Sequence, residues 1–199
     1  MVKALLERGA DITVTNKMGW TPLNTAADNG HTDIVKLLLE RGADLTISSI
    51  NGWVPLLSAA DEGHVDCVSL LLEFGADINQ RQTENGNSAL IYAAWKGNAA
   101  LLKLLLAHED VDLVARDSAG RTPIFYAAWS GEEEVVELLC LDQRVDPDAK
   151  DCHGITPLSV AVRRGNVKAA KLLLASGKPC AQRSRLFWTN AAVVCQKIQ

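Results

Sequence analysis

Glycine recurs in this chain at a nearly constant interval, and this interval constrains the fold more than any other sequence feature. One set of glycines lies 33 or 34 residues apart, and a second set follows each member of the first by eleven residues. With a third, shorter set they include all 14 glycines of the 199-residue chain: Gly19, Gly52, Gly86, Gly120 and Gly154; Gly30, Gly63, Gly97, Gly131 and Gly165; Gly9, Gly42, Gly75 and Gly177. A chain that repeats at this period folds as a stack of similar units.

The residues between the glycines predict two short antiparallel helices in each unit. After a glycine of the first set, a Thr or Ser followed by Pro is typical of a helix start, as in residues 21–23. The second glycine comes about eight residues later, where a left-handed residue can end that helix. A second helix then follows, as in residues 32–40, and its wide leucine face requires burial on more than one side. We therefore expect an all-α solenoid.

Two recurring strings show which repeat family this sequence resembles. The strings Gly-x-Thr-Pro-Leu-x-x-Ala-Ala-x-x-Gly-His and Leu-Leu-Leu-Glu-x-Gly-Ala-Asp resemble those of ankyrin repeats, over residues 1 to about 177. The resemblance implies an all-α ankyrin-repeat solenoid of helix-turn-helix repeats. The histidine that usually follows Thr-Pro-Leu in this family is replaced in every copy, so we expect the interfaces between repeats to depend more on apolar packing. That position holds Asn24, Leu57, Ile91, Phe125 and Ser159.

The same register divides the chain. We expect half of a repeat at residues 1–16, repeats at 17–49, 50–83, 84–117, 118–151 and 152–177, and a C-terminal tail at 178–199. The tail is either a helix that covers the last repeat or an unrelated segment. Because Met1 aligns with Ile34 inside a second helix, we expect the chain to be part of a longer array or multidomain protein.

Patterns that could indicate chemistry have a structural explanation. The pairs His31-x-Asp33 and His64-x-Asp66 recur one repeat apart in the same register, which favours a structural device in each repeat over a catalytic or metal site. The Cys152-His153 pair lacks a second pair of ligands at zinc spacing. Every glycine belongs to the repeat pattern, so none remains for a phosphate-binding loop. We expect a non-catalytic protein with no metal, cofactor or small-molecule substrate.

Composition excludes further classes. The net charge of −4 argues against a protein dominated by nucleic-acid binding. No apolar run approaches the roughly 20 residues that cross a bilayer, so we expect no membrane association. An odd number of cysteines, five, without paired spacing favours a reducing intracellular setting, either cytoplasmic or nuclear.

The remaining signal is variation at positions that the resemblance assigns to a partner-facing concave groove: the residue after the first glycine and the two residues before the second glycine. Four of the five tryptophans of the chain lie at these positions, and tryptophan is enriched in binding hot spots. The alternative is that Trp95 and Trp129 stack on each other and only stabilise the array. The candidate protein-binding residues are Trp20, Asp28, Trp53, Asp61, Glu62, Asn87, Trp95, Lys96, Arg121, Trp129, Arg163 and Arg164.

Charge is distributed unevenly along the array. Residues 163–199 carry eight Lys or Arg and no acid, whereas residues 1–162 carry 12 basic and 24 acidic residues. The groove should therefore change from acidic through aromatic to basic, which would orient an extended partner. The sequence predicts a protein–protein interaction module whose partner it does not identify. The alternative is the recognition segment of a larger enzyme (a kinase, NTPase or ubiquitin ligase) whose catalytic domain lies outside this chain.

Overall fold

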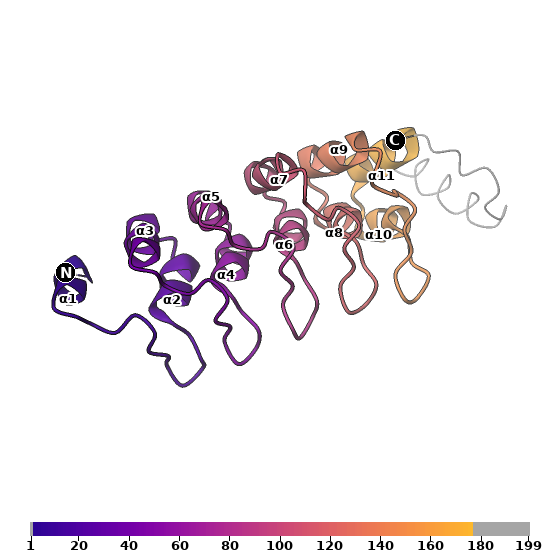
Figure 1. Cartoon of the computed structure of the whole chain (residues 1–199). Coiled ribbons are helices and arrows are strands. Elements are labelled where there is room, and N and C mark those ends of the chain that lie inside the picture. Colours follow the sequence, from indigo (N-terminus) through magenta and orange to yellow (C-terminus); the bar gives the residue numbers. More distant parts are fainter. Residues whose placement is uncertain (1, 177–199) are drawn as a thin grey trace.

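The protein is an array of helix pairs in two layers (Figure 1). The structure, a computed structural model, describes residues 2–176. These residues form a short helix α1 and five pairs in which a first and a second helix run antiparallel. The bounds are α1 Val2–Glu7, α2 Pro22–Asp28, α3 Thr32–Glu40, α4 Pro55–Glu62, α5 Val65–Glu73, α6 Ala89–Lys96, α7 Ala99–Leu106, α8 Pro123–Ser130, α9 Glu133–Leu141, α10 Pro157–Arg164 and α11 Val167–Ala175.

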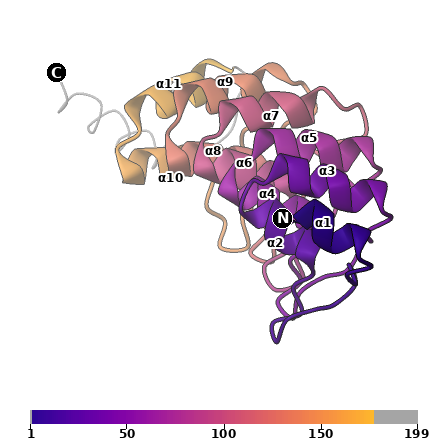
Figure 2. The ribbon, with the colours of Figure 1, turned by 90° about the vertical axis from the view of Figure 1, so that its left-hand side faces the viewer.

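The first helices form one layer and the second helices the other, with the connecting loops projecting beside the first layer (Figures 1 and 2). Among residues 2–176 the chain forms no strand, and one isolated antiparallel bridge joins Arg81 to Ser88 in a loop. The expectation of an all-α solenoid is confirmed. The expected tail at 178–199 lies outside the described residues.

The expected helix starts are confirmed at all five first helices, which begin at residues 22, 55, 89, 123 and 157, and a hydroxyl cap is present at three of them. The hydroxyls of Thr21, Ser88 and Thr156 accept hydrogen bonds from backbone N–H groups in the first turn of α2, α6 and α10. Val54 has no hydroxyl to offer at α4, and the hydroxyl of Thr122 at α8 has no hydrogen-bond partner. Proline at the first position supports these two helices instead.

Glycine ends four of the first helices as expected. Gly63, Gly97, Gly131 and Gly165 are the C-cap residues of α4, α6, α8 and α10, with φ between 69° and 81°. This left-handed conformation costs glycine nothing. In α2 the C-cap is Asn29, and the glycine lies one residue further on.

One continuous hydrophobic core runs through the array, between the two layers and between neighbouring repeats. The first helices α2, α4, α6 and α8 each contribute a buried pair of alanines, such as Ala93 and Ala94, whose small side chains let the next helix approach closely. In α10 the second alanine is replaced by Val162. Each second helix contributes buried branched residues, such as Leu101, Leu102 and Leu105 in α7. A single helix pair could not bury these faces alone, so the repeats depend on their neighbours.

The prediction of apolar interfaces is confirmed at three positions and wrong at one. Leu57, Ile91 and Phe125 are buried in the core. Asn24, however, donates a hydrogen bond from Nδ2 to the backbone oxygen of Trp53 in the next repeat, at 2.9 Å. The asparagine side chain is long enough to form a hydrogen bond between these two repeats.

Backbone hydrogen bonds connect the loops of neighbouring repeats. The N–H groups of Ile50, Ser118 and Cys152 donate to carbonyl oxygens of the preceding loop at 2.8–2.9 Å. At the remaining step the side-chain Nε2 of Gln82 donates to the backbone oxygen of Asn51, at 2.6 Å. These bonds fix the spacing of the loops and of the first helices that follow them.

Candidate functional site

In one of the two histidine pairs, His64 connects neighbouring repeats, which supports a structural role. Nε2 of His64 donates to the backbone oxygen of Asp28 at 3.0 Å, at the end of the preceding first helix. The His64 ring also fills the space that a Cβ on Gly30 would occupy, which explains why this position is a glycine. Asn98 and Asn166, in the same register, donate from Nδ2 to the ends of α4 and α8. A side chain at this position therefore bonds to the end of the preceding first helix in three of the repeats.

The cysteine–histidine pair forms no metal centre with its neighbours. Sγ of Cys152 lies 3.2 Å from Nδ1 of His153 at the tip of a loop. Within residues 2–176, no three His, Cys, Asp or Glu side chains are arranged to hold a metal ion.

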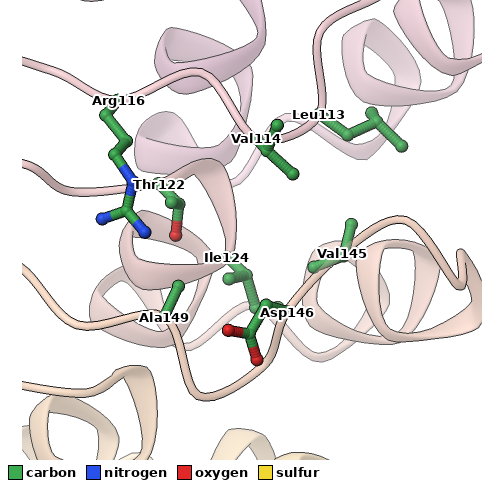
Figure 3. Close-up of a pocket in the computed structure, with 8 residues that line it drawn as sticks. All are labelled: Leu113, Val114, Arg116, Thr122, Ile124, Val145, Asp146 and Ala149. Atoms are coloured by element: carbon green, nitrogen blue, oxygen red, sulfur yellow. The ribbon is translucent and has the colours of Figure 1, made fainter.

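One small hollow lies between two neighbouring loops (Figure 3). Its lining includes Leu113, Ile124 and Val145, with Thr122 and Arg116 on its polar side. Its volume of about 40 Å³ is far below the several hundred Å³ of a typical small-molecule site. The hollow is therefore too small to hold a small-molecule ligand.

The C-terminal ends of the first helices bring most of the candidate residues into one row. The stacking of the repeats places equivalent positions of α2, α4, α6, α8 and α10 next to one another. We call these positions the helix-end row, which comprises Asp28, Asp61, Trp95, Trp129 and Arg163, each with the residue that follows it: Asn29, Glu62, Lys96, Ser130 and Arg164.

Contacts within the row join neighbouring repeats at two of its four steps. Nζ of Lys96 lies 3.2 Å from a carboxylate oxygen of Asp61, and the Arg164 guanidinium lies over the Trp129 ring, 4.6 Å from its centre. In both pairs the first position of one repeat meets the second position of the next. The row is thus an ordered surface whose side chains hold one another in place.

The first step of the row is different, because it brings two acids together. Partial burial raises the pKa of the Asp28 carboxyl, and the negative charge of Glu62 raises it further. His64 acts in the opposite direction, and Asp61 adds a smaller repulsion. This end of the row therefore carries acidic groups that repel one another.

The centre of the row is aromatic. Trp95 is 43% exposed, and its ring lies 5.8 Å from that of Tyr126, whereas Trp129 is half-buried beneath Arg164. The alternative that Trp95 and Trp129 stack on each other is not what the structure has, because each ring has a different neighbour. The tyrosine was not among the candidate residues, although its place one helical turn before Trp129 was a usable signal.

The residues after the first glycine lie nearer to the core than we expected. Trp53 is half-buried and stacks on Tyr92 of the next repeat, with ring centres 5.4 Å apart. Asn87 is only 3% exposed, which removes it from the surface that a partner can reach. Trp20 is half-buried, and Nη1 of Arg121 is 3.4 Å from the hydroxyl of Tyr126.

Two exposed apolar side chains at the loop tips were missed. Ile50 is 69% exposed and Met18 is 51% exposed, and the N–H of Ile50 donates to the backbone oxygen of Met18 at 2.9 Å. The repeat register hides this pair, because the two residues are not at equivalent positions of their loops.

Comparison with protein families matches a model described as ankyrin repeats (3 copies) to residues 1–82, 75–151 and 120–184. No curated protein sequence matches the chain significantly. Within residues 2–176, every helix is too short or too polar to span a bilayer.

Proposed function

Because the chain belongs to the ankyrin repeat family, whose repeats are generally protein–protein interaction modules, we propose that it binds a protein partner through its helix-end row without catalysing a reaction. Trp20, Trp53 and Arg121 are half-buried.

The exposure of Trp95 at the centre of the row is the observation that carries the proposal. Trp95 is 43% exposed and Trp129 in the next repeat is half-buried, so the centre of the row presents aromatic surface to solvent. Tryptophan is also the residue most enriched in binding hot spots, because it buries much surface with few rotatable bonds. On either side of it the row offers charged groups that can select a partner.

The contacts within the row favour binding. Tyr126 supports the Trp95 ring, Arg164 covers Trp129, and Lys96 pairs with Asp61. Side chains that are already held in place lose little conformational entropy when a partner binds. These contacts therefore lower the entropic cost of binding.

A photocrosslinking amino acid at position 95 tests this proposal, with the same amino acid at position 74 as the matched control. Phe74 is 42% exposed and lies at the C-terminal end of α5, in the other layer. In cell extract, we expect position 95 to crosslink to a defined protein that position 74 does not label. Equal labelling from both positions, or labelling from position 74 alone, would contradict the proposal.

A further inference from the structure

The helix-end row presents its chemistry in a fixed order. From α2 to α10 its first positions are Asp28, Asp61, Trp95, Trp129 and Arg163. The order is therefore acidic, acidic, aromatic, aromatic and basic, one group for each repeat. A surface with this order can distinguish one orientation of a partner from the other.

Within the described residues, the side chains at the first step of the row form no ion pair with one another. The second step is neutralised by the ion pair of Asp61 with Lys96. At the first step Asp28 is opposed by Glu62, which raises the pKa of its carboxyl. A cation supplied by a partner at this step would relieve the repulsion between the two carboxylates.

The basic end is also open to a counter-charge. Arg163 and Arg164 are both exposed, and neither forms an ion pair with an acidic residue in the part of the chain that the structure describes. Arg164 is held against the Trp129 ring, which limits the positions of its guanidinium. A carboxylate of a partner can therefore bind here without first displacing another acid.

The spacing of the row selects a conformation for the partner. Each first helix packs against the next, and packed helices lie about 8–10 Å apart. A polyproline II segment places every third residue on one face, at intervals of about 9 Å. A β-strand places every second residue on one face, at intervals of about 6.6 Å, which do not match the spacing of the first helices.

We propose that the helix-end row binds a polyproline II segment of a partner protein in which every third residue faces the row, in the order basic, basic, apolar, apolar, acidic. The first basic residue faces Asp28 with Glu62, and the second faces Asp61, where it competes with Lys96 for the carboxylate. The apolar residues face Trp95 and Trp129, and the acidic residue faces the two arginines. This inference rests on the proposed function and specifies the chemistry of the partner. Five contacts spaced three residues apart require a segment of about 13 residues.

A synthetic peptide tests the order and the spacing. The probe has 13 residues, with lysine at positions one and four, leucine at seven and ten, glutamate at thirteen, and proline or serine elsewhere. Its control has the same composition with the five residues placed two apart. Fluorescence anisotropy with the full 199-residue chain should show the probe binding at least about tenfold more tightly than the control.

Charge exchange tests the orientation. The double variant Arg163→Glu with Arg164→Glu should weaken the probe by about tenfold and should prefer a peptide whose final glutamate is replaced by lysine. Glu62→Lys should weaken the probe as well, and thermal unfolding of each variant shows that it is folded. The proposal is overturned if the probe and the control bind alike, or if the double variant does not reverse the preference.

A random peptide library separates the further inference from the proposed function. The library is selected on the wild-type chain and then counter-selected on Trp95→Ala. Peptides that require Trp95 and share the proposed order and spacing support the inference. Peptides that require Trp95 but have another order overturn the inference and leave the proposed function in place. If no peptide requires Trp95 and position 95 gives no crosslink, both are overturned.

Discussion

The guanidinium carbon of Arg164 lies 4.6 Å from the centre of the Trp129 ring, although the two residues belong to different repeats. Arginine is well suited to this contact, because its planar cation lies flat on an aromatic face and remains charged at all physiological pH values. The contact connects the aromatic centre of the helix-end row to its basic end. It also gives Arg164 a structural role that its neighbour Arg163 lacks.

Replacing Arg164 with alanine should therefore reduce stability. Cation–π contacts at exposed sites contribute about 0.5–1 kcal/mol, and we expect a loss in the unfolding free energy of this size. The matched control is Arg163→Ala, which should stay within about 0.5 kcal/mol of the wild type because this residue is exposed. Equal effects of the two substitutions in urea unfolding would show that the ring contact does not contribute.

Tyr126 should be more sensitive to loss of its hydroxyl than Tyr92. The Tyr126 hydroxyl donates to a carboxylate oxygen of the buried Asp117 at 2.6 Å, whereas the Tyr92 hydroxyl accepts from an amide of Asn85 at 3.2 Å. Hydrogen bonds to charged groups contribute about 1.5–3 kcal/mol and neutral ones about 1 kcal/mol. We expect Tyr126→Phe to cost more than Tyr92→Phe in denaturant unfolding, and a reversed order would refute this explanation.

The pKa of Asp28 should depend on Glu62. Burial raises the pKa of this carboxyl first and Glu62 second, so Glu62→Gln should lower the Asp28 pKa while leaving it above the ordinary value. A raised carboxyl pKa means that the deprotonated form is less favourable in the folded chain than in the unfolded one. This group therefore opposes folding at neutral pH, and its effect disappears as the pH falls through its pKa. NMR titration of the Asp28 carboxyl measures the shift, and an unchanged pKa in the variant would show that the two carboxylates do not interact.

Asn79 should stabilise the contact between two loops on the side of the second helices. Its Nδ2 donates to the backbone oxygen of Asp110 at 2.8 Å, and its Oδ1 accepts from the N–H of Asp112 at 2.8 Å. Asn79→Ala removes both bonds and should cost about 1–2 kcal/mol. Asn79→Asp keeps the acceptor and loses the donor, so it should destabilise the chain as well. Unfolding free energies equal to that of the wild type in both variants would contradict this role.

The repeat pattern was sufficient to predict the fold. Glycine spacing and the Thr-Pro pairs define short helices, and an apolar face that one helix pair cannot bury requires a stack. Position in the repeat also predicted that Trp95 and Trp129 lie on one row, because equivalent residues of stacked repeats become neighbours. Such predictions need only the residues at the helix ends and the length of the repeat.

Contacts between repeats could not be predicted in this way, because they depend on the reach of individual side chains. The side chain of Asn24 is long enough to donate a hydrogen bond to the Trp53 carbonyl. The prediction that apolar packing replaces the usual histidine did not include this bond. Asn87 is buried, and it closes a turn that is one residue longer than the equivalent turns: the N–H of Gln82 bonds to an oxygen five residues on, whereas that of Asp117 bonds to one four residues on. The repeat signature does not reveal this difference between the turns.

The central claim is that Trp95 serves binding rather than folding, and a comparison of Trp95→Ala with Phe74→Ala tests it most directly. The two rings are 43% and 42% exposed, so both substitutions should lower the unfolding free energy by a similar amount, about 1–2 kcal/mol. Affinity for a peptide selected on the wild-type chain should fall at least about tenfold in Trp95→Ala and remain unchanged in Phe74→Ala. An equal loss of affinity in both variants, in proportion to their loss of stability, would contradict the account.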